Sequence, residues 1–389
     1  MKRLFCALLA ALILCGCGGP ALRAGYYLLP LEESEGMPFY FSLEPDGTGF
    51  VHAMGQDVPI TWTPAGLGGD FADGTVEAVI TAANHHCRHG STTLFPTTLS
   101  SSLAQIGDSL AAVREAKRSA DLLPNIPGVH LEGPYFSKKQ CGAQNPDFIT
   151  PPVPADYLQL LDSYSDVICR WSYAPELPGA AEFQQELNKR GVISSAGHSD
   201  AIYDDLLSAY DAGLKLITHM YSCTSTITRE KGFRRLGVIE FAYLMDDVVV
   251  EAIADGCHIP SELFRLLYKI KGGNNICLGT DAMNCCGIDA AVSSIGGVPC
   301  KIKYGVACLM DESAFAGSIA TADRLVRFAV KDVGLSVPEA VKMMTANPAR
   351  VMGLTKKGRL AAGMDGDILI FDEDIRIQKV FAGGKEVAL

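Results

Sequence analysis

The feature that most constrains the fold is a regular alternation of short apolar segments and helical patterns between about residues 68 and 350. Strands are predicted at 91–97, 128–132, 167–172, 192–195, 216–219, 248–253 and 276–279, and helices at 76–88, 101–120, 180–190, 202–212 and 260–271. Asp73 is expected to cap the first of these helices and Gly90 to end it. Apolar strands that alternate with helices pair in parallel, and this many units favour a closed (β/α)8 TIM-like barrel over an open sheet. Only seven strands are convincing, so the first strand of the α/β barrel is doubtful.

Length and charge fit one large domain with appendages. A chain of 389 residues, 48% of them hydrophobic, can bury a large core. The net charge of −11 argues against a nucleic-acid partner, which would require a basic surface. An anionic small molecule would have to be bound by a local basic pocket.

Residues 1–20 resemble a lipoprotein export signal. Lys2 and Arg3 precede an apolar run over 4–14, and Leu14-Cys15-Gly16-Cys17 resembles a lipobox, which predicts a membrane lipid anchor on Cys17. The alternatives are a misassigned start or an uncleaved apolar tail. Ten cysteines follow Cys17 without the spacing of a disulfide scaffold, which is typical of a reducing compartment. The sequence therefore leaves localisation open between lipid-anchored export and the cytoplasm.

Residues 21–66 have a different sequence pattern. Two aromatic-rich segments, 39–43 and 49–53, flank Asp46-Gly47 and predict a β-hairpin. We place the boundary with the barrel near residue 66. The resulting divisions are a signal-like segment (1–20), a small β segment (21–66), the barrel (67–357) and a C-terminal remnant of a small β-domain (358–389).

Five polar residues stand at or just past the ends of predicted strands: Glu132, His198, His219, His258 and Asp281. The carboxyl ends of barrel strands carry the active site in enzymes of this architecture. One such histidine alone is more often solvated or hydrogen-bonded than a ligand, and Asp281 alone would be read as a helix N-cap. Together, a carboxylate and two imidazoles suit one Zn²⁺ or Fe²⁺ with a position left for water. Asp281 could then act as proton acceptor and donor, and His258 could hydrogen-bond a carbonyl oxygen as negative charge develops.

Six segments, in order along the chain, resemble the signatures of N-acetylglucosamine-6-phosphate deacetylases, a branch of the amidohydrolase superfamily. They are His130-Leu131-Glu132-Gly133-Pro134, Cys141-Gly142-Ala143-Gln144-Asn145-Pro146, Ser195-Ala196-Gly197-His198-Ser199-Asp200-Ala201, Thr218-His219-Met220-Tyr221, Ile253-Ala254-Asp255-Gly256-Cys257-His258 and Gly279-Thr280-Asp281-Ala282-Met283. The resemblance covers about residue 68 to the end. It implies a metal-dependent deacetylase that acts on a phosphorylated amino sugar, and it suggests a homodimer.

The resemblance also implies roles residue by residue. The metal ligands would be Glu132, His198 and His219, with Asp281 as acid/base and His258 polarising the carbonyl or contacting the sugar. The sugar site would be lined by Ala143, Gln144, Ser222, Cys223, Ala316 and Gly317, the last two on a loop after an irregular segment at 284–311. Arg229 would face the 6-phosphate, where a guanidinium can donate two charge-assisted hydrogen bonds. Without the resemblance, Arg229 would be read as a surface arginine.

The N-terminal part departs from the family pattern. Members have a first barrel strand that carries His-x-His or a substitute, and Trp62 and Pro64, which cannot ligate a metal, stand near those positions. We therefore hypothesise a lipoprotein-like segment fused to a truncated deacetylase, with residues 58–63 as candidates to fill the gap. Two other functions stay open: another metal-dependent amidohydrolase, such as a dihydroorotase or dipeptidase, or a lipoprotein that binds amino sugars without turnover.

Overall fold

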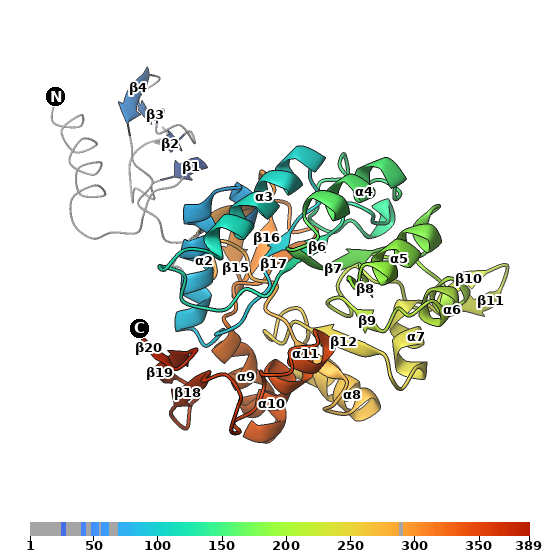
Figure 1. Cartoon of the computed structure of the whole chain (residues 1–389). Coiled ribbons are helices and arrows are strands. Elements are labelled where there is room, and N and C mark those ends of the chain that lie inside the picture. The colour runs from blue at the N-terminus through green and yellow to red at the C-terminus, as the bar shows by residue number, and fades with distance from the viewer. Residues whose placement is uncertain (1–24, 29–39, 44–47, 54–55, 62–68, 288–290) are drawn as a thin grey trace.

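A seven-stranded parallel sheet forms the centre of the molecule (Figure 1). The computed structural model describes residues 25–28, 40–43, 48–53, 56–61, 69–287 and 291–389. The sheet has the order β13-β12-β9-β8-β7-β6-β5, and each neighbouring pair is parallel. Its strands are β5 (Thr97–Thr98), β6 (Val129–Glu132), β7 (Ile168–Tyr173), β8 (Ile193–Ala196), β9 (Leu216–Ile217), β12 (Val249–Ala252) and β13 (Ile276–Leu278). The predicted barrel-like α/β fold is confirmed, and within the described residues no eighth strand joins β13 to β5.

Helices lie around the outside of this curved sheet (Figure 1). They are α2 (Val76–Arg88), α3 (Leu103–Ala116), α4 (Pro154–Ser163), α5 (Ala180–Lys189), α6 (Tyr203–Asp211), α7 (Val238–Leu244), α8 (Ser261–Lys271), α9 (Ala322–Lys331), α10 (Val337–Met344) and α11 (Ala346–Val351). Each long helix buries one stripe, as α8 buries Phe264 and Leu267, because apolar residues three or four apart share a face. No helix in the described part combines the length and hydropathy that a bilayer crossing requires.

An aromatic cluster packs between the sheet and α5. Trp171 of β7 stacks on Tyr135 at 5.6 Å between ring centroids, and Phe183 of α5 meets Trp171 edge-on at 5.1 Å. All three side chains are fully buried, and the Trp171 indole N–H donates to the Gly133 carbonyl at 2.8 Å. Buried aromatics contribute large apolar area, and their polar atoms need partners. The cluster fixes β6 and β7 where the first candidate ligand, Glu132, leaves the sheet.

Two local predictions around α2 are wrong. The strand expected at 91–97 reduces to Thr97–Thr98 plus an isolated bridge at Thr93, since Pro96 has no N–H to give to a ladder. The cap of α2 is Thr75, whose side chain accepts from the Ala78 N–H at 3.2 Å. Asp73 instead ends a short 3-10 turn, η1 (Phe71–Asp73).

An antiparallel sheet lies near the N-terminus. It consists of β1 (Gly25–Leu28), β2 (Tyr40–Leu43), β3 (Thr48–Ala53) and β4 (Gln56–Thr61). The predicted hairpin is confirmed as β2 and β3. β4 pairs with β3, so the expectation that this segment fills the gap in the barrel is wrong for residues 58–61. Cys17, Trp62 and Pro64 lie outside the described residues, and the fusion stays a hypothesis.

The segment expected to be irregular forms a second antiparallel sheet. Its strands are β14 (Val292–Ile295), β15 (Val298–Lys303), β16 (Val306–Leu309) and β17 (Phe315–Gly317). The connections Gly296-Gly297 and Tyr304-Gly305 have positive φ at both residues, which is the geometry of two-residue hairpins. A third small sheet, β18 (Ile368–Phe371), β19 (Ile377–Ala382) and β20 (Lys385–Val387), forms the expected C-terminal β segment.

Candidate functional site

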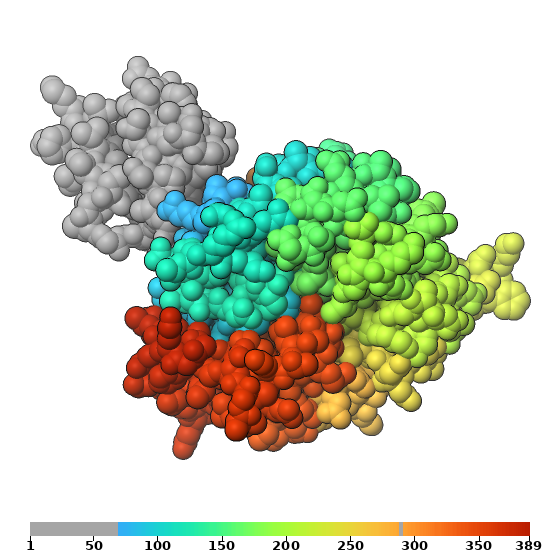
Figure 2. Space-filling view, viewed as in Figure 1, coloured from blue at the N-terminus to red at the C-terminus, as the bar shows by residue number. Residues whose placement is uncertain are grey.

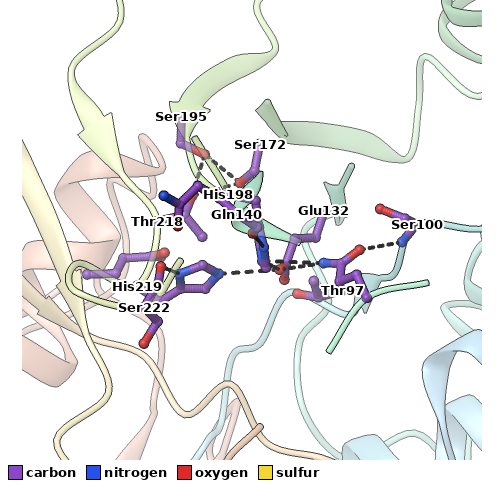
Figure 3. Close-up of polar contacts among 12 residues, drawn as sticks. Thr97, Ser100, Glu132, Gln140, Ser172, Ser195, His198, Thr218, His219 and Ser222 are labelled. Atoms are coloured by element: carbon purple, nitrogen blue, oxygen red, sulfur yellow. Dashed lines mark hydrogen bonds and ion pairs between the residues drawn. The ribbon is translucent and has the colours of Figure 1, made fainter. Parts of the chain in front are cut away.

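A carboxylate and two imidazoles converge at the carboxyl ends of β6, β8 and β9 (Figure 3). Oε1 of Glu132 lies 2.8 Å from Nε2 of His198 and 3.3 Å from Nε2 of His219. All three side chains are buried, and their candidate ligand atoms lie within 4.8 Å of one another. The sequence-predicted ligands therefore meet at one point, although they come from strands distant in the chain.

The second ring nitrogen of each histidine is also held. Nδ1 of His198 lies 2.8 Å from the Gln140 carbonyl oxygen, and Nδ1 of His219 lies 3.1 Å from the Ser222 carbonyl oxygen (Figure 3). A ligating histidine usually donates its other N–H in this way, which orients Nε2 toward the metal. Both histidines adopt positive φ, 46° and 27°, and such strained backbone conformations concentrate at functional sites.

The electrostatics of the cluster favour a bound cation. Burial alone would raise the pKa of Glu132, but contacts with His198 and His219 hold it well below its usual range. A buried carboxylate needs compensating positive charge, and this donor set suits divalent ions such as Zn²⁺ or Fe²⁺. The arrangement is thus consistent with a divalent metal site, as the sequence predicts.

Asp281 follows β13 and faces the same space. Its carboxylate is accessible from a cavity, yet protein surrounds it closely enough that burial, followed by the charge of Glu132, raises its pKa. Its carbonyl oxygen accepts from the Ser318 N–H at 2.9 Å, and the Met283 N–H donates to the Ser318 carbonyl at 2.9 Å. These bonds fix a residue with a φ of 44° beside the triad.

Asp255 fixes His258. Nδ1 of His258 lies 2.7 Å from one Asp255 oxygen, and the other oxygen accepts from the backbone N–H groups of Cys257 and His258 at 2.9 and 2.8 Å. The ring also packs edge-on against Phe315, with centroids 5.0 Å apart. Because the two ring nitrogens lie on opposite sides, this arrangement directs Nε2 of His258 away from Asp255. Sequence reasoning missed Asp255, although its spacing of three residues from His258 was a usable signal.

Gln144 lies at the triad. Its Nε2 donates to Oε1 of Glu132 at 2.9 Å, and its Oε1 accepts from the Ser100 N–H at 2.9 Å. The Cys223 thiol contacts His198 and contributes to raising the pKa of that histidine well above its usual value, against the larger effect of burial. Ser222 contributes its carbonyl to His219.

The remaining predicted substrate-site residues lie in two separate parts of the structure. Ala143 and Ala316 belong to a small apolar cluster with Met283, and Gly317 approaches the Asp281 backbone. Arg229 is exposed on the hairpin of β10 (Thr228–Glu230) and β11 (Phe233–Arg235), which projects from the body at the right of Figure 2. Within one chain, the structure does not bring Arg229 into the cavity that Glu132 and Asp281 line.

Comparison with known proteins gives the family. The amidohydrolase family model matches residues 61–387. The chain belongs to the amidohydrolase family. It is 33% identical over 258 residues to the N-acetylglucosamine-6-phosphate deacetylase of Lysinibacillus sphaericus, spanning 66% of this chain and 65% of that relative. The deacetylase of Bacillus subtilis is 28% identical over 80% of this chain and 78% of its own length.

A solved structure agrees with these relatives. The deacetylase from Mycobacterium smegmatis, an Asp-to-Ala variant in complex with N-acetyl-D-glucosamine 6-phosphate, has a TM-score of 0.77 and 28% identity. The similarity covers 89% of this chain and 96% of that one. The predicted resemblance to these deacetylases is confirmed.

Beneath the triad, this amidohydrolase has a polar layer that sequence reasoning missed. The hydroxyls of Ser172, Ser195 and Thr218 form a ring with oxygen separations of 2.7–3.0 Å (Figure 3). Nε2 of His130 lies 2.6 Å from the Ser172 hydroxyl. Arg170 continues the network, donating to Ser195 at 3.1 Å and to Thr218 at 2.8 Å. Bulky branched apolar side chains usually fill such layers, so a polar layer here is a distinctive feature.

A cavity of about 600 Å³ connects the triad with the barrel interior. Its wall includes Glu132, Asp281, the Arg170–Glu251 pair and Leu369 of β18. Residues of β13 and of the segment leading to β5 also line it, so it lies beside the two sheet edges that no described strand pairs.

Proposed function

We propose that this amidohydrolase removes the acetyl group from N-acetyl-D-glucosamine 6-phosphate and releases D-glucosamine 6-phosphate and acetate. The observation that carries the proposal is the convergence of Glu132, His198 and His219, with Asp281 on the wall of the same cavity. The names of the relatives support the substrate. The match to the Lysinibacillus sphaericus deacetylase covers 65% of the length of that relative.

In this proposal, Glu132, His198 and His219 hold one divalent cation, either Zn²⁺ or Fe²⁺. Such an ion lowers the pKa of a bound water from about 16 to about 7 and polarises a carbonyl oxygen. Asp281 takes the proton of the attacking water and returns it to the leaving amine, a role that its raised pKa suits. With both ring nitrogens protonated, His258 donates from Nδ1 to Asp255 and from Nε2 to the amide oxygen as negative charge develops.

The substrate contacts are also proposals. Ala143, Ser222, Cys223, Ala316 and Gly317 lie around the metal site or beside Asp281 and would line the sugar. Gln144 would orient Glu132 as well as contact the sugar, because its amide already spans Glu132 and the Ser100 backbone. Arg229 would bind the 6-phosphate. The homodimer and the lipid anchor on Cys17 stay predictions.

The decisive experiment measures acetate release by the full chain. Metal is first removed with a chelator, and Zn²⁺ is then added, or Fe²⁺ under anaerobic conditions. Each form is assayed with N-acetylglucosamine 6-phosphate, with N-acetylglucosamine, and with N-acetylgalactosamine 6-phosphate. We expect metal-dependent hydrolysis of the 6-phosphate, and an Asp281→Asn variant about 10²–10⁴-fold slower. Asp374→Asn, at an exposed aspartate outside the cavity, is the matched control and should retain full rate.

The alternatives give different results. Binding of the sugar phosphate without acetate release under either metal would favour the non-catalytic lipoprotein. Hydrolysis of dihydroorotate or a dipeptide in preference to the sugar phosphate would favour another amidohydrolase. Full activity of Asp281→Asn would contradict the acid/base assignment.

A further inference from the structure

The last turn of α2 and the residue that caps it carry a pair of neighbouring histidines. His85 and His89 are four residues apart, and their ring centroids lie 4.8 Å from each other. Residues at this spacing are neighbours on a helix surface, and a histidine pair so placed can share one metal ion. His86, one residue along, points elsewhere, with its ring centroid 6.0 Å from that of His85 in an edge arrangement.

Both histidines of the pair lie beside Gly287, which carries no side chain. Nε2 of His85 is buried and forms no hydrogen bond of good geometry among the described residues, although the Cys286 backbone lies near enough to the ring to affect its pKa. A Cβ added to Gly287 would lie 2.6 Å from Nε2 of His85 and 3.6 Å from Nε2 of His89. The Nε2 atoms of both histidines therefore lie next to the same glycine. A buried nitrogen without a partner is costly, and an ion is one of the groups that satisfies it.

The second ring nitrogen of His89, Nδ1, faces a carboxylate. Its Nδ1 lies 3.7 Å from Oδ1 of Asp323. That carboxylate is itself held by the Thr321 hydroxyl at 2.5 Å and the Arg327 guanidinium at 2.7 Å. This carboxylate stands on the Nδ1 side of the ring, at ion-pair rather than hydrogen-bond distance, and leaves Nε2 on the opposite side.

Local charge agrees with a cation. Burial, followed by the nearby His89, lowers the pKa of His85, which favours the neutral imidazole that a metal ion requires. The pair also stands at the carboxyl end of α2, where the helix dipole favours positive charge. His89 lines the cavity, so an ion can reach the pair from there.

We propose that His85 and His89 bind a divalent transition-metal ion such as Zn²⁺, with water completing its coordination, at a site separate from the triad. Within the described residues, three protein ligands converge only at Glu132, His198 and His219. The second site therefore binds more weakly than the first. Imidazole ligands favour Cu²⁺ over Zn²⁺, so Cu²⁺ is the tighter probe.

The experiment counts ions in the full chain. A parent variant, Glu132→Gln/His198→Gln, removes the triad, so that any remaining ion belongs to the second site. Titration of the chelator-treated parent with Zn²⁺ should give one bound ion by calorimetry. Cu²⁺ should give an electron paramagnetic resonance signal split by two imidazole nitrogens.

Matched changes in that parent test the assignment. His89→Gln should abolish the remaining ion, whereas His86→Gln on the same turn should retain it. Circular dichroism and the melting temperature confirm that each variant is folded. The proposal is overturned if the parent binds no ion, or if its His89→Gln form still binds one. Because the readout is binding in a triad-free protein, the result does not depend on deacetylase activity.

Discussion

Replacing Glu251 by Gln should strongly destabilise the barrel, because it leaves a buried guanidinium without its counter-charge. Arg170 of β7 is buried, and both of its terminal nitrogens donate to the Glu251 carboxylate on β12. The bond from Nη2 measures 2.7 Å. Arg170 also donates to Ser195 and Thr218, so its guanidinium cannot turn toward water without breaking the polar layer.

The magnitude follows from the burial of the pair. Removing one partner of a fully buried ion pair costs about 3–5 kcal/mol. The Glu251 side chain is 21% exposed and lines the cavity, where water screens part of the charge. We therefore expect Glu251→Gln to lower the free energy of unfolding by about 2–3 kcal/mol. An Arg170→Met/Glu251→Leu variant removes both charges and should lie within about 1 kcal/mol of the wild type.

Urea unfolding in excess chelator measures these differences. The matched control is Lys379→Ala, which breaks an ion pair with Glu386 whose side chains are 52% and 55% exposed. That change should cost less than about 0.5 kcal/mol, since exposed pairs contribute little. A cost for Glu251→Gln no larger than the control would refute the reasoning, because it would mean that water already solvates Arg170.

Three further predictions test other parts of the structure. Asp255→Asn should lower kcat for acetate release about 10–100-fold with little change in KM, because His258 loses the carboxylate that orients it; an unchanged kcat would contradict this role. Burial, followed by the charges of His85 and His89, lowers the pKa of His86 from 6.5 to about 4. The unfolded chain therefore takes up the proton first as the pH falls, and about 3 kcal/mol of stability present above pH ~6.5 should be lost by pH ~4. Urea unfolding across that pH range should show that the free energy of unfolding falls less with decreasing pH in His86→Gln than in the wild type. Phe183→Ala should cost about 3–5 kcal/mol in the same assay, because its ring is fully buried against Trp171; a cost under 1 kcal/mol would show that the aromatic cluster collapses around the gap.

Helices and strand positions were predictable where local signals agreed with packing. The helix at 76–88 was predicted with its observed bounds because an apolar stripe and Gly90 both point to it, although its cap is Thr75 and not the predicted Asp73. The hairpins of β14 to β16 were missed, although Gly296-Gly297 and Tyr304-Gly305 flanked by strand-forming residues are hairpin signals. The shortness of β5 depends on Pro96 and on pairing with β6, which a single segment does not reveal.

The candidate ligands were predictable because parallel strands bring their carboxyl ends to one edge whatever their separation in sequence. The polar layer was not predictable from the sequence, because it depends on which residues of different strands lie on the same inner face at the same depth. Arg170 and Ser172 alternate on β7, but only the register with β8 and β9 brings Ser195 and Thr218 beside them. Gln144 was assigned to the sugar alone, since nothing in its loop reveals the bond to Glu132.

Asp281 is held by backbone hydrogen bonds with the segment after β17. In a closed barrel, the residue after β13 would have strand neighbours on both sides, whereas here the described residues pair β13 only with β12. The segment after β17 takes over this role, because Ser318 exchanges backbone hydrogen bonds with Asp281 and Met283 across an isolated parallel bridge at Ala282. Among the described residues, the proposed acid/base is therefore held by Ser318, which directly follows β17.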